Sequence, residues 1–412
     1  MDRLERADVV VVGGGLVGLA TAHRLLGLRP DLRLTLIEQA PVLAAHQSGH
    51  NSGVLHAGLY YAPGSLKARL CREGKAELER FAQAQGIPVG RPGKLVVAVE
   101  PGELARLDEL ERRARANEVP GLERVGPERV RELEPHAAGL AGLWSPTTAV
   151  IDFGQVAAAL GAAVRQQGAT IVLGRRVLAI RDRGAERLVR TSAGDVVARD
   201  VVVCAGLQAD RLARRSGEHD VPRIVPFRGD YHVLRPAARD LVRGLLYPVP
   251  DPRFPFLGVH FTRRVDGEVW AGPNAVLAFA RDGYRRRDVR LRDLAETVTY
   301  AGFWRLARPY LRTGLAEQWR DLSRSAFAAA LRRYVPELRD ADLEPGPSGV
   351  RAQALRPSGE LVDDFVLGGS GHVLHVLNAP SPAATACLAI GRVLAETALE
   401  RFELRGPGLG AA

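Results

Sequence analysis

Cysteine, lysine and long apolar runs are all scarce in this chain. The 412 residues include three cysteines, Cys71, Cys204 and Cys387, which lie far apart and lack CxxC spacing. Such usage argues against a disulfide framework or a zinc site and fits a reducing cytoplasm. No apolar run is long enough to span a membrane, and a buried strand begins where a signal peptide would have its apolar core. We therefore expect a cytoplasmic protein, with the inner face of the cell membrane as the one membrane surface open to it.

Acidic residues are outnumbered by basic ones, and the basic ones are almost all arginine. There are 57 Lys and Arg against 47 Asp and Glu, a formal net charge of +10, and lysine occurs only at positions 67, 75 and 94. The arginines are scattered and form no stripe, so we expect no nucleic-acid partner. An acidic small substrate or an anionic membrane surface suits this charge better. With a hydrophobic fraction of 46%, a chain of this length can bury a large core and fold as two domains.

The segment from Asp8 to Glu38 has the pattern of a nucleotide-binding βαβ unit. Residues 9–12 are four consecutive valines, which is typical of a strand buried on both faces. Residues 16–28 have the apolar periodicity of a helix, and a second apolar strand follows at residues 34–37. Because strand, glycine turn, helix and second strand occur in this order, the segment predicts a dinucleotide site.

Three glycines and one acid of this unit are the expected contacts. Gly13 allows the tight turn, Gly15 lets the backbone approach a pyrophosphate, and Gly18 permits close packing of the helix on the strand. The phosphates would lie at the helix N-terminus, where free N–H groups and the helix dipole favour negative charge. Glu38 would accept hydrogen bonds from an adenosine ribose and disfavour the 2′-phosphate of NADP. This unit leaves FAD and NAD as alternatives.

A second informative stretch follows between Pro41 and Tyr61. It is dense in small and hydrogen-bonding residues, which indicates a loop around a polar ligand rather than a core strand. Its histidines, His46, His50 and His56, are close in sequence, but no Cys or carboxylate accompanies them. We therefore expect no metal site here.

Four strings in the chain resemble the FAD-dependent, D-amino-acid-oxidase-like superfamily. Within that group they are similar to the L-2-hydroxyglutarate oxidase/dehydrogenase branch, and the similarity extends from Asp8 to about Arg401. The resemblance implies FAD as the cofactor. It also implies conversion of L-2-hydroxyglutarate to 2-oxoglutarate by hydride transfer to flavin N5. The strings are those of residues 48–67, 226–231, 254–262 and 272–278.

The resemblance and the residue pattern together predict an α/β fold with two domains. The first is a discontinuous, Rossmann-like FAD-binding domain, and the second is a mixed-sheet substrate-binding domain with a helical insertion near residues 285–335. Helical periodicity at residues 153–167, a buried strand at 200–204 and strand-rich patterns after 221 support this division. We assign residues 1–90, 145–220 and 345–402 to the FAD-binding domain, 91–144 and 221–344 to the substrate-binding domain, and 403–412 to a flexible tail.

Further cofactor contacts are expected in three places besides the glycines and Glu38. The loop after Glu38 passes under the flavin ring in relatives, and Val177 would contact adenine through its backbone. The turn after residues 200–204 would approach the dinucleotide, with an ordinary strand-to-helix turn as the alternative. A helix starting near Pro382 would place its positive end by the flavin pyrimidine ring. The residues concerned are Gln47, Ser48, Asn51, Ser52, Val177, Ala205, Gly206, Pro380 and Ser381.

Catalysis is expected to depend on His260 or His56 as the base and on Arg351 as the carboxylate anchor. A neutral imidazole titrates near the working pH, and the planar fork of an arginine can hold a carboxylate bidentately. A buried core histidine and a surface salt bridge are the plain alternatives for these residues. The remaining substrate contacts expected are Tyr231, Gln353 and Asn378 in the pocket, with Lys67 or Arg228 at the distal carboxylate.

Other functions stay open at this point, because fold alone does not imply function. An amine or amino-acid oxidase of the same superfamily would use the same fold, and a flavin-binding module acting on RNA or a membrane belongs to another class. The sequence does not tell whether oxygen or a membrane quinone accepts the electrons. A basic, aromatic helix near residues 300–312 would suit contact with an anionic membrane.

Overall fold

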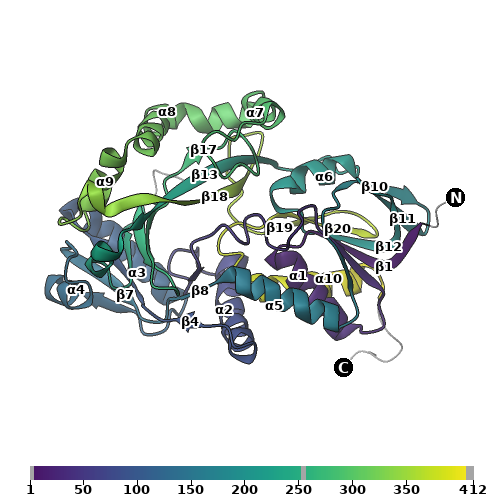
Figure 1. The fold of residues 1–412 in the computed structure, drawn as a ribbon, viewed down its shortest axis with the longest axis horizontal. Coiled ribbons are helices and arrows are strands. Elements are labelled where there is room, and N and C mark those ends of the chain that lie inside the picture. Colours follow the sequence, from purple (N-terminus) through teal and green to yellow (C-terminus); the bar gives the residue numbers. More distant parts are fainter. Residues whose placement is uncertain (1–3, 252–256, 405–412) are drawn as a thin grey trace.

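Two large β-sheets organise the chain in the computed structural model (Figure 1). The structure describes residues 4–251 and 257–404, and for residues 311–313 and 315–322 only the backbone. In these parts the first sheet has eight strands, and its main path runs β10-β11-β12-β1-β2-β9, with β20 beside β12 and β19 beside β20. Their bounds are β1 Glu5–Val12, β2 Leu34–Ile37, β9 Thr170–Val172, β10 Val177–Arg183, β11 Glu186–Thr191, β12 Val196–Val203, β19 Val366–Gly368 and β20 Val373–Asn378.

The core of the first sheet is parallel and buried on both faces. β1 pairs in parallel with β12 on one side and β2 on the other, in a register that joins Val12 to Val203 and to Ile37. β2 continues to β9 and β12 to β20, also in parallel. The valines of β1 have no more than 6% of their surface exposed. Val9 and Val11 pack in one hydrophobic cluster, and Val10 and Val12 pack in another on the opposite face.

Helices pack on both faces of the first sheet. On one face α1 (Leu16–Leu28) contacts α5 (Phe153–Gln166) and α10 (Cys387–Arg401), and α2 (Leu66–Ala84) lies against α10. On the other face α6 (Ala209–Arg215) contacts β10 and β20. Figure 1 shows α1, α5 and α10 together on one side of this sheet and α6 on the opposite side. The sheet therefore has the layers of a doubly wound nucleotide-binding domain.

The second sheet is mixed and has nine strands in the described residues. Its main path is β17-β13-β16-β15-β14-β5-β7-β6, and β18 pairs with β13 along almost its whole length. The bounds are β5 Lys94–Ala98, β6 Glu123–Val125, β7 Ala141–Ser145, β13 Arg223–Leu234, β14 Leu245–Pro248, β15 His260–Arg263, β16 Val269–Gly272, β17 Val276–Leu277 and β18 Leu343–Leu355.

Two hydrophobic clusters hold this second sheet. One cluster joins it to α9 (Arg324–Arg332) and α4 (Pro127–Leu133), and the other joins it to α3 (Leu104–Ala116). The predicted helical insertion is present as α7 (Leu291–Val298), α8 (Ala301–Leu322) and α9. A small three-stranded sheet comprises β3 (Val54–Leu55), β8 (Ala149–Ile151) and β4 (Val89–Gly90). Short 3₁₀ segments cover Pro101–Glu103, Gly206–Gln208, Pro236–Leu241 and Asp340–Asp342.

Three details of the predicted organisation need correction. The FAD-binding domain was assigned from residue 345, but β18 continues the second sheet to Leu355, so this boundary moves past that strand. The last helix was expected to start near Pro382, whereas residues 382–386 form turns and α10 begins at Cys387. The tail was expected from residue 403, yet Leu404 is 3% exposed and packs in the core beside α10. Residues 405–412 lie outside the described residues.

No helix in the described parts of the chain is both long and apolar enough to cross a membrane.

Candidate active site

A cavity of approximately 1120 Å³ lies between the two sheets. Its walls come from the β1–α1 turn, the loop after β2, the ends of β12 and β20, and the faces of β14, β15 and β18. Every residue predicted to contact the cofactor lines it, and so do most of those predicted to contact the substrate. The predicted residues that line it are Gly13, Gly15, Gly18, Glu38, Gln47, Ser48, Asn51, Ser52, His56, Lys67, Val177, Ala205, Gly206, Tyr231, His260, Arg351, Gln353, Asn378, Pro380 and Ser381.

The glycine turn leaves no room for side chains. A Cβ added at Gly18 would lie 2.0 Å from the carbonyl oxygen of Gly13, and one added at Gly13 would lie 2.3 Å from that of Cys204. Gly13 also has a φ of +110°, which favours glycine. The turn therefore brings the N-terminus of α1 to the cavity wall, where its N–H groups can face an anion.

Glu38 is fixed at the end of β2. Its carboxylate accepts hydrogen bonds from the backbone N–H groups of Gly14 (2.6 Å) and Ala40 (2.8 Å), and the residue is only 6% exposed. These bonds join the acid to the glycine turn. The carboxylate is thus held beside the phosphate-binding turn, which is the position that ribose recognition requires.

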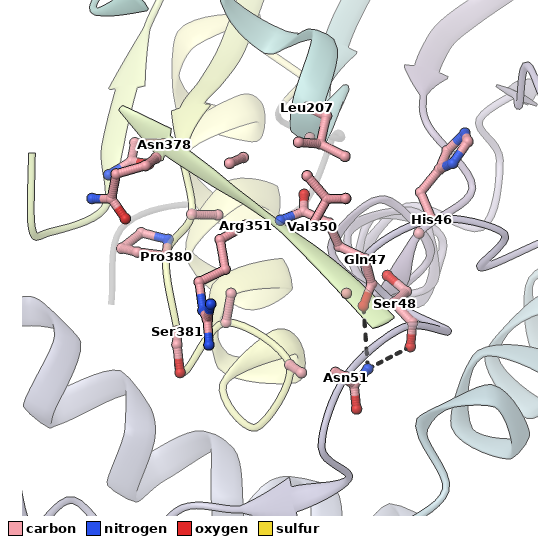
Figure 2. A pocket seen from close by; sticks show the side chains of 18 of the residues that line it. His46, Gln47, Ser48, Asn51, Leu207, Val350, Arg351, Asn378, Pro380 and Ser381 are labelled. Carbon is pink, nitrogen blue, oxygen red and sulfur yellow. Dashed lines mark hydrogen bonds between the residues drawn. The ribbon is translucent and has the colours of Figure 1, made fainter. Parts of the chain in front are cut away.

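The loop of residues 46–52 is attached to the start of α1. The Ser48 hydroxyl accepts a hydrogen bond from Leu16 N–H at 3.0 Å, and the Asn51 amide donates to the carbonyls of Gln47 (3.2 Å) and Ser48 (2.7 Å). Figure 2 shows Gln47, Ser48 and Asn51 next to one another at the cavity wall. Because Ser48 is bonded to α1 and Asn51 to the backbone of the loop, the loop forms a wall of defined shape against a ligand.

The segment before α10 closes the other side of the cavity. Pro380 and Ser381 line it, and Figure 2 shows the side chain of Arg351 extending toward Ser381. Thr385 accepts a hydrogen bond from His56 N–H and donates one to Val54 O, both at 3.2 Å. These bonds connect this segment to the loop that carries His56.

Arg351 is held in the second sheet with its guanidinium in the cavity. It lies on β18, opposite Phe227 of β13, and donates a hydrogen bond to Asn274 O at 3.3 Å. Burial lowers the pKa of this guanidinium below its ordinary value. A buried cation is stabilised by an anion, so the arrangement favours a carboxylate ligand.

His260 presents one defined nitrogen to the cavity. Its Nδ1 lies 2.9 Å from Gly258 O, and because a carbonyl only accepts, Nδ1 carries the proton and Nε2 has a free lone pair. The imidazole stacks on Tyr247 at 3.8 Å between ring centres. Burial lowers the pKa of His260 to about 3, the Gly258 hydrogen bond opposes that shift, and the nearby cations Lys94 and Arg351 add to it.

His56 lies in the same part of the cavity with a less defined ring orientation. Burial lowers its pKa well below the ordinary value, and Lys94, His260 and Lys67 add to this effect in that order. Its backbone N–H is the donor to Thr385, while no side-chain hydrogen bond orients its ring among the described residues. His260 is therefore the better oriented of the two neutral imidazoles.

The two candidates for the distal carboxylate differ in position. Lys67 lines the cavity and donates to the carbonyl (2.9 Å) and the carboxylate (2.7 Å) of Asp363. Arg228 is not among the residues that line it, and its guanidinium bonds to Asp230 at 2.9 Å on the same strand. The geometry therefore favours Lys67 over Arg228 as the contact for the distal carboxylate.

Sequence reasoning missed three tyrosines of the cavity wall. Tyr60, Tyr61 and Tyr247 line the same region as His56 and His260. The first two follow His56 closely in the sequence of the loop, so their position could have indicated a place in the site, but no role was assigned to them. Tyr247 stands in an apolar strand and offered none. The part of the chain that the structure describes contains no cluster of metal-binding side chains.

Comparisons with known proteins agree with this geometry. The model of the family "FAD dependent oxidoreductase" matches residues 8–397. The mitochondrial L-2-hydroxyglutarate dehydrogenase of Caenorhabditis elegans is 46% identical over 411 residues, covering 97% of this chain and 95% of that protein. The L-2-hydroxyglutarate dehydrogenase of Indibacter alkaliphilus is 42% identical over 396 residues, covering 96% of this chain and 99% of that protein.

The chain belongs to the L-2-hydroxyglutarate dehydrogenase family of FAD-dependent oxidoreductases. The predicted resemblance is confirmed, and FAD is the cofactor. The predicted fold class is confirmed as well. Dithionite-reduced L-α-glycerophosphate oxidase from Mycoplasma pneumoniae with FAD bound superposes with a TM-score of 0.79 at 23% identity, covering 96% of this chain and 95% of that one. Glycine oxidase from Geobacillus kaustophilus gives 0.73 at 19% identity, covering 99% and 97%.

Proposed function

We propose that this chain oxidises L-2-hydroxyglutarate to 2-oxoglutarate and passes the electrons to oxygen or a membrane quinone. The observation that carries the proposal is the meeting of Arg351 and His260 in one cavity with the dinucleotide-binding turn. Oxidation of a 2-hydroxy acid needs a cation for the carboxylate and a base for the hydroxyl proton, next to a hydride acceptor. All three requirements converge here, and the named relatives act on this substrate.

The cofactor fits the cradle that the chain provides. The turn at Gly13, Gly15 and Gly18 has no room for side chains, so a phosphate there would bind to backbone N–H groups. Glu38 lies beside the turn, where it would accept hydrogen bonds from the ribose. We assign the flavin end to Gln47, Ser48, Asn51 and Ser52 on one wall and to Ala205, Gly206, Pro380 and Ser381 on others, with Val177 at the adenine end. When bound, FAD supplies the hydride acceptor at N5.

Arg351 and His260 divide the work on the substrate. Arg351 binds the carboxylate next to the hydroxyl, which fixes the carbinol carbon. His260 Nε2 accepts the hydroxyl proton, since its Nδ1 is already occupied by the bond to Gly258 O. His56 stands second because no hydrogen bond in the described residues fixes its ring. Tyr231, Gln353 and Asn378 complete the pocket wall.

Lys67 is the proposed contact for the distal carboxylate. It is the cavity-lining candidate of the two that the sequence offered, and its ammonium group is held in place by Asp363. A second cation distinguishes a five-carbon diacid from lactate. Replacement of Lys67 by Met should therefore lower kcat/KM for L-2-hydroxyglutarate much more than for a monocarboxylate 2-hydroxy acid.

Peripheral membrane contact and a cytoplasmic location on the inner face of the membrane are part of the same proposal. Apolar side chains are exposed on and before α7 and on α8, with Leu291 at 80% and Trp304 at 44% exposure, and arginines stand between them. Such a surface suits anionic lipid headgroups. Sedimentation with anionic but not zwitterionic vesicles, lost in a Leu291→Asp/Trp304→Asp variant, is the expected result; equal sedimentation of both proteins would contradict it.

The substrate is tested by product analysis with an artificial electron acceptor. The holoenzyme should convert L-2-hydroxyglutarate to 2-oxoglutarate without release of ammonia, and should turn over amino acids at a far lower rate. Ammonia release from an amino acid, with no oxidation of the hydroxy diacid, would keep the fold and overturn the substrate. Salt-sensitive binding of RNA without turnover of any small acid would favour the flavin-binding module instead.

A further inference from the structure

Lys94 is a buried cation without an acidic partner. It begins β5 and is 1% exposed, yet among the described residues no carboxylate pairs with it and no acceptor receives a hydrogen bond from its ammonium group. Its Nζ lies 4.0 Å from the ring centre of Tyr247 and 5.2 Å from that of Tyr60. Two aromatic faces attract a cation weakly compared with a carboxylate, so the charge of Lys94 is incompletely compensated within the protein.

Two tyrosines of the cavity wall separate this cation from the substrate space. Tyr60 and Tyr247 both line the cavity, while Lys94 stands behind them. β14 lies between β5 and β15, so Tyr247 stands between Lys94 and His260 and stacks on the imidazole of His260. The field of Lys94 therefore reaches the cavity through one aromatic layer.

The other side chains at the substrate end supply too little positive charge for a dianion. A hydroxy diacid carries two negative charges into the cavity. Arg351 supplies one positive charge, His260 and His56 are neutral, and the charge of Lys67 is shared with Asp363. One positive charge is still required to balance the dianion, and Lys94 is the nearby cation in the described residues without an acidic partner.

We propose that Lys94 is the second positive charge that the site presents to a dicarboxylate, and that it takes up a proton when the dianion binds. The inference rests on the proposed substrate, and it adds to the site a residue that does not touch the substrate. Lys94 acts on specificity at a distance, whereas Lys67 makes the contact.

The surroundings of Lys94 explain the proton uptake. Burial lowers its pKa to about 7, so a substantial part of the free enzyme carries a neutral amine at neutral pH. A bound dianion raises that pKa again, and protons are taken up between the two values. Binding of the diacid should therefore weaken as the pH rises above about 7. The titratable groups facing Lys94 are His56 after β3, Tyr60, Cys71 of α2, Tyr247 of β14 and His260 of β15.

These neighbours titrate in other ranges. Burial raises the pKa of Cys71 to about 12, and the pKa values of the two histidines lie well below 7 in the free enzyme. Uptake near neutral pH therefore reports on Lys94, and uptake at acidic pH reports on the imidazoles.

The experiment measures binding of 2-oxoglutarate to the FAD holoenzyme by titration calorimetry in two buffers of different ionisation enthalpy. The wild-type protein should take up a fraction of a proton between about pH 7 and pH 8.5, and its Kd should rise across this range. Lys94→Met should raise Kd at about pH 6 roughly tenfold for the diacid and change it little for a monocarboxylate 2-oxo acid. Lys94→Arg should bind the diacid without proton uptake, because a guanidinium stays charged.

Lys75 provides the matched control. It is a lysine of α2 that pairs with Glu79 at 2.9 Å and does not line the cavity, so Lys75→Met should retain both the proton uptake and the preference for the diacid. Absence of proton uptake by the wild-type protein would overturn the inference even if the Lys94 variants failed to fold. An equal loss of mono- and dicarboxylate binding in Lys94→Met would also overturn it. Failure of the holoenzyme to bind any diacid would instead reject the proposed substrate.

Discussion

Gly18 is the position where one added methyl group should cost the protein its cofactor. A Cβ there would lie 2.0 Å from Gly13 O and 3.1 Å from Gly13 C, against a limit of 3.0 Å that Cβ atoms rarely cross. Both neighbours are backbone atoms of the phosphate-binding turn, so α1 must move by about an ångström to restore normal contact. Overpacking of this kind costs about 3 kcal/mol, which outweighs the gain of about 1 kcal/mol from glycine to alanine in a helix.

The same helix contains a matched control. A Cβ at Gly27 would meet only Gln167 Nε2, at 3.9 Å. Gly27→Ala should therefore keep full FAD content and raise stability by about 0.5–1 kcal/mol. Gly18→Ala should lose most of its FAD and lower Tm by about 2 °C even at saturating FAD. Two measurements test this. The first is the ratio of flavin to protein absorbance in the purified variants, and the second is thermal unfolding without added FAD and at saturating FAD. Full flavin content in Gly18→Ala, or equal losses in both variants, would refute the steric argument.

Three further predictions concern charge and burial. Arg351→Met should lower kcat/KM for L-2-hydroxyglutarate roughly a hundredfold, with partial recovery in Arg351→Lys; an unchanged value would remove Arg351 from the site. Arg281→Met should lower the free energy of unfolding by about 2–3 kcal/mol, because the buried Asp210 loses one of its two arginine partners and keeps only Arg214. Arg292→Met on the surface should change it by no more than about 0.5 kcal/mol in denaturant titration. Burial lowers the pKa of His375 from 6.5 to about 4, so the unfolded chain takes up the proton first and the free energy of unfolding falls as the pH drops from 6.5 to 4. His375→Leu should remove about 3 kcal/mol of that fall. An equal fall in the wild-type and variant proteins over this pH range would contradict it.

The nucleotide-binding half was predictable because its signals are local. Four valines, three spaced glycines and one terminal acid determine β1, the turn and Glu38, and the predicted helix at residues 16–28 matches α1. The turn places Gly18 against Gly13 by geometry that any such unit requires. This part of the cavity wall could therefore be predicted from the local sequence, without knowledge of the tertiary contacts.

The substrate half depends on pairings that the sequence does not encode locally. β18 joins β13 far away in the chain, so the domain boundary near residue 345 could not be read from composition. Arg228 and Asp230 alternate along one strand, and only the folded sheet shows that they bond to each other. Lys94 stands in a strand buried along its whole length, where nothing in the sequence shows that a lysine faces aromatic rings.

Anaerobic reduction of the bound flavin tests the central claim most directly. The purified holoenzyme is mixed with L-2-hydroxyglutarate, and flavin absorbance is followed, with the D-enantiomer, L-lactate and amino acids as controls. The account predicts rapid bleaching by the L-hydroxy diacid alone. An oxidised spectrum that persists with this substrate, together with bleaching by an amino acid, would contradict it.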